Sequence, residues 1–269
     1  MAPHKMFVLL YLVFFKCGLM VHGDPHQNIQ LNPSSSSHMS HGSLFIRFDE
    51  IHVGKIIKTK FDFLDPSKSS AHHFLPREVA DSIPFSSSEL PNILPLFSIP
   101  QGSRKSMVME DTLFNCEHGV ILEGEIRTCA TSLESMLDFV SGLFGSRDAI
   151  RVLTNTHEPT SRGTSDEYVT VEVEEIPVLK MIGCHLMPYP YTIYGCHHLS
   201  NTKTKVFRVS VEGNEGDQVK IPVVCHMNTS TWDPNHEAFQ TLNFKPGAAP
   251  VCHMFPEGDL AWIQPSKSV

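Results

Sequence analysis

Apolar residues follow a helical spacing in the first half of the chain. The clearest case is a stripe of positions three or four residues apart: Leu133, Met136, Leu137, Val140 and Phe144. A single stripe at this spacing is typical of a helix that buries one face. We expect this helix to begin at Thr131, whose side chain can cap the Glu134 amide while Glu134 reaches back. Gly145 should end it.

Two shorter helices are expected before this one. The first is opened by Pro76, and the second carries apolar residues at Leu90, Ile93, Leu94 and Phe97. Ahead of both, order should begin near Leu44, and residues 55–63 have the pattern of a strand.

The pattern changes near residue 149, where apolar and polar residues begin to alternate with a period of two. Residues 168–175 and 206–211 are the clearest runs. Such alternation is typical of strands that bury one face. Turn-forming residues at 214–216 and 246–247 separate the runs, which favours antiparallel pairing. The sequence thus predicts an α+β fold, with short helices in the N-terminal part followed by a mostly antiparallel β C-terminal part.

The N-terminal end has a different composition. Residues 1–23 have the features of a secretory signal peptide, since a basic start precedes an apolar run at 6–15 and small residues near Gly23. A membrane anchor is the alternative, but Lys16 stops the run too early to cross a bilayer. Residues 24–43, rich in Ser, His, Asn and Pro, are interpreted as a flexible linker, 44–264 as one domain and 265–269 as a tail.

These features predict entry into the secretory pathway and delivery to the extracellular space, the apoplast or a vacuole. The formal net charge of −8 argues against nucleic acid as a partner.

Cysteine usage agrees with an oxidising compartment. Without Cys17 of the predicted signal peptide, six cysteines remain: Cys116, Cys129, Cys184, Cys196, Cys225 and Cys252. An even number predicts disulfides, with buried thiols as the alternative. Cys116 and Cys129 are close enough in sequence for a local bridge, but the full pairing stays open.

Four of these cysteines are each followed directly by histidine. The dipeptides are Cys184-His185, Cys196-His197, Cys225-His226 and Cys252-His253, separated by 10, 27 and 25 residues. With only 7 Cys and 16 His in 269 residues, four such pairs are too many for chance. The spacing does not fit a structural zinc site, which usually takes cysteines two to four residues apart.

On an extended strand, adjacent side chains point to opposite faces. The four cysteines can therefore form two disulfides on one face while His185, His197, His226 and His253 converge on a metal ion on the other. The alternative is that each histidine is an ordinary hydrogen-bonded residue beside a disulfide. An imidazole cluster without thiolate suits copper or zinc, and copper has the higher intrinsic affinity for nitrogen ligands.

This arrangement of dipeptides resembles the signature of the plant BURP-domain family. Further stretches resemble the family's recurring segments: 74–85 (FLPREVADSIPF), 129–136 (CATSLESM), 189–191 (YPY), 232–236 (WDPNH) and 250–253 (PVCH). The resemblance extends over about 44–263.

Members of that family include seed and stress-associated proteins, a cell-wall subunit associated with pectinase, and copper-dependent peptide cyclases. For a cyclase, the resemblance implies Cu²⁺ held by the four signature histidines and oxidative cross-linking of a Tyr or Trp side chain in a ribosomal precursor peptide. Because residues 24–43 contain neither Tyr nor Trp, we expect a separate peptide as substrate. The alternative is a non-catalytic cell-wall, seed or vacuolar protein with a role in development or stress, with wall polysaccharide or wall protein as partner.

Three further residues are candidates for a role in function. His236 is a candidate general base or partner of a metal ligand, and Tyr191 a candidate catalytic residue on a substrate pocket, with helix capping and core packing as the respective alternatives. Asn228, in Asn-Thr-Ser, is a possible glycosylation acceptor.

Overall fold

The computed structural model describes residues 44–59, 73–145, 150–158, 165–214 and 216–266. The predicted signal peptide and linker lie outside these residues, as does most of the predicted tail. The predicted strand at 55–63 appears as β2 (Ile56–Lys58), and residues 60–63 are not described.

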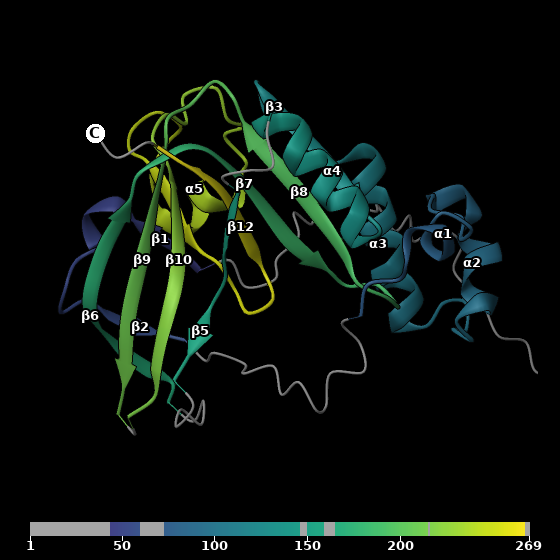
Figure 1. Ribbon diagram of the computed structural model, residues 1–269, viewed down its shortest axis with the longest axis horizontal. Helices are drawn as coiled ribbons and strands as arrows, with labels where there is room; N and C mark the ends of the chain where they lie inside the picture. Colours follow the sequence, from purple (N-terminus) through teal and green to yellow (C-terminus); the bar gives the residue numbers. More distant parts are fainter. Residues whose placement is uncertain (1–43, 60–72, 146–149, 159–164, 215, 267–269) are drawn as a thin grey trace, which may run out of the picture. The chain divides into compact units, whose positions relative to one another are not determined.

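Two antiparallel sheets hold the larger part of the regular secondary structure among the described residues (Figure 1). The seven-stranded sheet, here called sheet A, has the order β1 (Leu44–Arg47), β11 (Val251–Met254), β10 (Gln218–His226), β9 (Thr204–Gly213), β6 (Glu167–Ile176) and β2, with β5 (Thr156–His157) also paired to β10. The five-stranded sheet B has the order β3 (Glu125–Ala130), β8 (Ile193–Leu199), β7 (Val178–Met187), β12 (Leu260–Pro265) and β4 (Arg151–Leu153). The predicted antiparallel character is confirmed.

The helices are short and are not confined to the N-terminal part. They are α1 (Arg77–Ala80), α2 (Leu90–Leu96), α3 (Arg104–His118), α4 (Leu133–Phe144) and α5 (Glu237–Leu242), with 3₁₀ turns η1 (Phe48–Glu50) and η2 (Ser87–Glu89). Strands β1 and β2 precede the first helix, and α5 falls between β10 and β11. The prediction that helices come first is therefore too simple, because pairing with distant strands turns short N-terminal runs into sheet edges.

Helix α4 lies where the apolar stripe predicted it, with Met136, Val140 and Phe144 buried. Its cap is one residue later than expected. The Ser132 hydroxyl accepts the Ser135 amide at 3.1 Å, and the Ser135 hydroxyl lies 3.1 Å from the Ser132 amide. Leu133 then falls in the first turn and is 41% exposed, so its predicted burial is wrong. Gly145 ends the helix with a φ of 75°.

Helix α3 was not predicted, because its buried residues include the polar Ser106 and Thr112, which hide the stripe of Met109 and Leu113. Its start carries a recognisable signal, since the Ser103 hydroxyl accepts the Ser106 amide at 3.2 Å.

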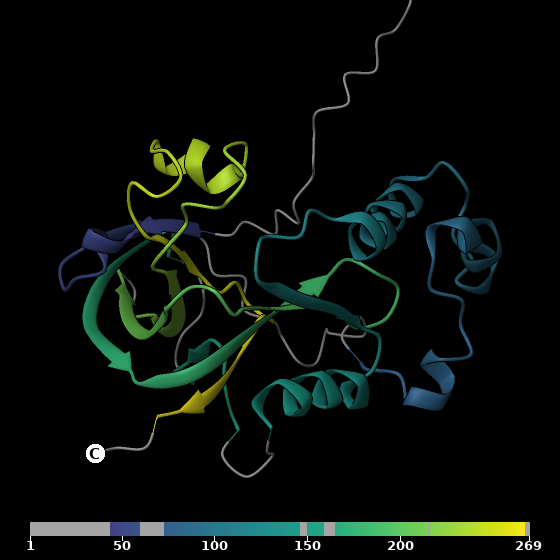
Figure 2. The ribbon, with the colours of Figure 1, turned by 90° about the horizontal axis from the view of Figure 1, so that it is seen from above.

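The apolar core has one large cluster within sheet A and further clusters on both faces of sheet B. One face of this sheet packs on α4, where Met136, Val140 and Phe144 meet Ile182 and Cys184. The other face packs on sheet A, where Met181, Ala261 and Ile263 meet Val206 and Val224. Figure 2 shows α5 (yellow-green) beside β1 (purple), at one side of sheet A. Within the described residues, no helix is both long and apolar enough to span a membrane.

Candidate metal centre

Each of the four Cys-His dipeptides lies on a strand, and the strands pair in twos. In sheet B the register sets Cys184 of β7 opposite Cys196 of β8, and in sheet A it sets Cys225 of β10 opposite Cys252 of β11. Both cysteine pairs are disulfides with Cα atoms 4.0 Å apart. The bridges therefore join residues that stand directly across an antiparallel ladder.

The sulfurs and the imidazoles occupy opposite faces of these strands. Cys184 and Cys196 pack toward α4, and Cys225 and Cys252 pack into the apolar core of sheet A. The histidine that follows each cysteine points the other way, as strand alternation requires. Two histidines of sheet B thus face two histidines of sheet A across the space between the sheets.

The four imidazoles form a closed ring of neighbours. Ring centroids are 5.3 Å apart for His185 and His197, 6.3 Å for His197 and His226, 5.7 Å for His226 and His253, and 5.7 Å for His253 and His185. Residues far apart in sequence are brought together because each strand pair supplies one side of this ring.

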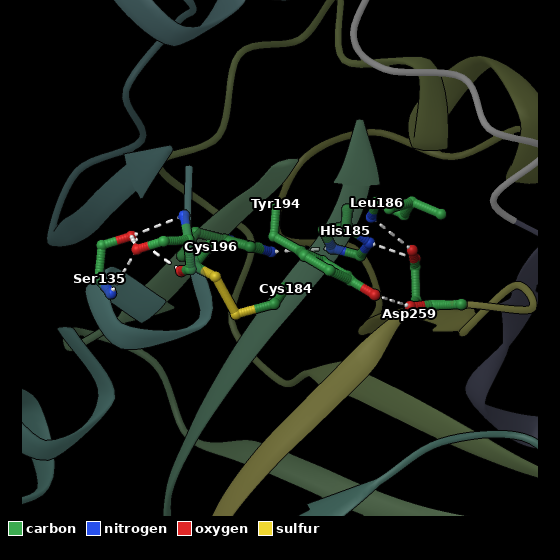
Figure 3. The surroundings of a disulfide bond; sticks show 10 residues. Ser135, Cys184, His185, Leu186, Tyr194, Cys196 and Asp259 are labelled. Carbon is green, nitrogen blue, oxygen red and sulfur yellow. Dashed lines mark hydrogen bonds and ion pairs between the residues drawn. A yellow bond between two sulfur atoms is a disulfide. The ribbon is translucent and has the colours of Figure 1, made fainter. Parts of the chain in front are cut away.

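His185 and His197 approach each other most closely, with Nε2 atoms 3.3 Å apart. The His185 Nδ1 lies 2.6 Å from Asp259 Oδ2, and the His197 Nδ1 lies 3.3 Å from Glu125 Oε1. Figure 3 shows the contact with Asp259 next to the Cys184–Cys196 bridge. A carboxylate accepts only, so each Nδ1 carries the proton it donates.

His185 and His197 form the first half of the ring of imidazoles, and the pKa values in this half depend on the neighbouring carboxylates. Burial disfavours the charged His185 imidazolium, but the adjacent Asp259 carboxylate outweighs burial and raises the pKa of His185. Burial likewise works against the charged form of Glu125, yet its hydrogen bonds to His197 and to the Leu122 amide keep the pKa of Glu125 lowered.

His226 and His253 form the second half of the ring, in an apolar setting. Burial, with the neighbouring imidazoles, lowers the pKa of His226 to about 3 and holds the pKa of His253 well below its usual value. The His226 Nδ1 is buried without a hydrogen-bond partner among the described residues. The His253 ring stacks on Phe255 at 5.2 Å, and Trp232 packs on His226 at 5.3 Å. Both rings are therefore neutral at pH 7.

Glycine leaves space beside the first pair. The register sets Gly183 opposite His197 and Gly195 opposite His185, whereas Val251 stands opposite His226. A Cβ at Gly183 would lie 3.2 Å from the His197 Nε2 and 3.4 Å from the His185 Nε2. The residue before each dipeptide distinguishes the two pairs in the sequence: it is glycine before the first two dipeptides and valine before the last two. The dipeptides alone do not reveal this difference.

All four imidazoles line one pocket of about 420 Å³. Aromatic residues form part of its wall: the Trp232 ring lies 4.9 Å from His236, and the Phe45 ring lies 6.2 Å from His236. Val120 and Ile121 also line the pocket and are 46% and 62% exposed. The pocket is thus lined by the four imidazoles, by aromatic side chains and by two exposed apolar residues.

The other predicted residues have different positions. His236 lines the pocket and caps α5, since its Nδ1 accepts the Ala238 amide at 3.2 Å. Tyr191 does not line the pocket. It is 5% exposed in a core cluster with Met187 and Ile193, and burial raises its pKa to about 12.

Two further predictions concern bridging and glycosylation. The local bridge Cys116–Cys129 is present, with Cα atoms 5.8 Å apart, and it borders the pocket. Asn228 is exposed in the loop after β10, and its side-chain oxygen accepts the Ser230 amide at 3.1 Å.

The geometry bears on metal binding in two ways. Among the described residues, no group of three or more His, Cys, Asp or Glu side chains is already arranged as a metal site. Two nitrogens bound at about 2.05 Å to one ion are roughly 3.3 Å apart at the tetrahedral angle of zinc and roughly 2.9 Å apart at the right angle that copper(II) prefers. The His185 and His197 Nε2 atoms, 3.3 Å apart, match the first separation and are close to the second. The partnerless Nδ1 of His226 and the space beside Gly183 are compatible with a metal ion in this pocket.

Fold and site together define a mostly antiparallel β protein, stapled by disulfides, that gathers four imidazoles in one pocket. The BURP domain model matches residues 44–264, so the chain belongs to the BURP domain family. Protein RAFTIN 1B of Triticum aestivum is 39% identical over 229 residues, covering 84% of this chain and 60% of that protein.

Other relatives show similar agreement. BURP domain-containing protein BNM2A of Brassica napus is 39% identical over 227 residues, covering 82% of this chain and 79% of that protein. BURP domain protein USPL1 of Arabidopsis thaliana is 41% identical over 196 residues, covering 70% of this chain and 69% of that protein. The chain therefore spans less than two thirds of the wheat protein and more than two thirds of the other two.

Proposed function

We propose that this protein binds copper through His185, His197, His226 and His253 and catalyses oxidative cross-linking of a Tyr or Trp side chain in a separate precursor peptide. The observation that carries the proposal is the pair of His185 and His197 Nε2 atoms, 3.3 Å apart in a pocket that His226 and His253 also line.

The donor set favours copper among the common metals. Four imidazoles without a free thiolate suit borderline ions, and copper(II) has the highest intrinsic affinity for such nitrogen ligands. The signature cysteines are all committed to disulfides, so they do not compete as ligands. Copper(II) held by these imidazoles would supply one-electron oxidation of a phenol or an indole, with dioxygen as the terminal oxidant.

The protein's own residues supply binding and orientation. The rings of Phe45, Trp232 and His236 offer a surface on which an aromatic substrate side chain can stack beside the imidazoles. In the reaction the peptide loses two hydrogen atoms as the new bond forms, and dioxygen takes up the two electrons and two protons.

The test uses the purified protein, copper(II), dioxygen and synthetic peptides that contain one Tyr or one Trp. We expect a product lighter than the peptide by two hydrogen atoms, and no product when Phe replaces the Tyr or Trp. His226→Asn should abolish the product. His157→Gln is the matched control, because His157 lies outside the pocket beside Glu257 and its loss should leave the product unchanged.

Stoichiometric copper without any product across many peptides would contradict the enzymatic proposal. It would leave a disulfide-stapled, metal-binding protein without turnover. Zinc alone at full occupancy of the purified protein would remove the oxidative chemistry.

A further inference from the structure

We propose that Asp259 and Glu125 are positioning residues which make His185 and His197 the preorganised half of the metal centre, leaving His226 and His253 to complete it. This inference rests on the proposed metal site and goes beyond it, because it assigns roles to two carboxylates outside the Cys-His signature.

The two carboxylates are held in the same manner. Asp259 accepts the Leu186 amide with Oδ1 at 2.9 Å and contacts the His185 Nδ1 with Oδ2 at 2.6 Å. Glu125 accepts the Leu122 amide with Oε2 at 2.8 Å and contacts the His197 Nδ1 with Oε1 at 3.3 Å. In each case one oxygen is anchored on the backbone, so the other holds an imidazole in a fixed direction.

This anchoring determines which nitrogen of each imidazole faces the pocket. In a neutral imidazole, a proton on Nδ1 leaves Nε2 with a bare lone pair that can bind a metal ion. The two Nε2 lone pairs then face each other across 3.3 Å, an arrangement that favours a cation between them. Carboxylate–histidine contacts of this kind orient ligands and raise their basicity in metal sites generally.

Burial restricts the movement of both carboxylates. The Asp259 side chain is 3% exposed and the Glu125 side chain 9% exposed. Asp259 belongs to the turn before β12, where Tyr194 donates its hydroxyl proton to the neighbouring Gly258 carbonyl at 2.7 Å. The turn is therefore tied to β8 as well as to β7, the two strands that carry His185 and His197.

The second pair of imidazoles has a different support. The His226 Nδ1 has no hydrogen-bond partner among the described residues, and the ring is held by packing on Trp232. The His253 ring is held by stacking on Phe255. Packing leaves a ring more freedom to rotate than a hydrogen bond to a buried carboxylate, so this half can close onto an ion held by the first.

Asp259→Asn is the sharpest test, because an amide has one accepting atom where the carboxylate has two. If its oxygen keeps the Leu186 amide, its NH₂ group faces the His185 Nδ1 and moves the ring proton to Nε2, which then cannot bind a metal. We expect about 10- to 100-fold weaker copper(II) binding by chelator competition and an altered copper(II) electron paramagnetic resonance spectrum.

Two further variants separate positioning from folding. Glu125→Gln should weaken copper(II) binding in the same direction, and Asp259→Glu should restore part of the affinity because it keeps a carboxylate. Glu257→Gln is the matched control: Glu257 contacts His157 at 2.7 Å, two residues from Asp259, and its loss should leave affinity and spectrum unchanged. Thermal unfolding of each metal-free variant shows whether the fold is retained.

Wild-type affinity and spectrum in both Asp259→Asn and Glu125→Gln would overturn the inference. An equal loss in Glu257→Gln would do the same, since it would trace the effect to the loop alone. These outcomes differ from failure of the proposed function, in which the wild-type protein binds copper(II) normally and yields no cross-linked peptide.

Discussion

Removing the two cross-strand disulfides one at a time should reveal how each supports the site. Cys225–Cys252 closes a segment of 27 residues, which carries Trp232, His236 and α5, whereas Cys184–Cys196 closes a segment of 12. All four cysteines are between 0% and 1% exposed, so replacing either pair with alanine costs similar packing. The difference between the two double variants therefore isolates the effect of loop length.

The magnitude follows from the chain entropy that each bridge removes from the unfolded state. For the longer segment the expected contribution is about 3.6 kcal/mol and for the shorter about 2.8 kcal/mol. The Cys225→Ala/Cys252→Ala variant should thus be less stable than Cys184→Ala/Cys196→Ala by about 0.8 kcal/mol. The ladder hydrogen bonds remain in both variants, so the strand register and the facing of the imidazoles should persist.

Urea unfolding of the metal-free proteins, followed by circular dichroism, measures this difference. Copper(II) affinity measured on the same folded samples should change much less than stability. The reasoning is refuted if the shorter bridge proves the more stabilising, or if either variant folds but loses copper binding altogether.

Three other changes test the pocket and its surroundings. Gly183→Ala places a methyl group 3.2 Å from the His197 Nε2, so copper(II) affinity should fall. The control is Gly142→Ala on α4, where a Cβ would have nothing within 4 Å. It should leave copper(II) affinity unchanged and raise the free energy of unfolding in urea by up to about 1 kcal/mol. Tyr191→Phe removes a buried hydroxyl that has no hydrogen-bond partner among the described residues, so the urea midpoint of the variant should not fall. A loss of cross-linking with intact copper binding would support the prediction that Tyr191 is catalytic. Trp232→Leu takes away the ring beside His226 and His236 and should raise the KM for an aromatic peptide more than it lowers kcat, whereas an unchanged KM would place the peptide elsewhere.

Local patterns were sufficient for several parts of the structure. The spacing of Met136, Val140 and Phe144 predicted α4, because a helix repeats its face every three or four residues. Period-two alternation predicted strands, and the turn-forming residues between them favoured antiparallel pairing. The adjacency of each cysteine to a histidine required opposite faces on those strands. These are properties of neighbours in the chain, so they can be read without knowing the fold.

Contacts between distant residues needed the tertiary structure. The pairing Cys184–Cys196 and Cys225–Cys252 depends on which strands lie side by side, and six cysteines leave that choice open. Asp259 reaches His185 across 74 positions, and no local pattern distinguishes its carboxylate from others in the chain. Neighbouring positions in the chain are enough to place sulfur and imidazole on opposite faces of a strand. The meeting of the four imidazoles depends on strand register and on the packing of the two sheets, because these join residues that the chain keeps apart.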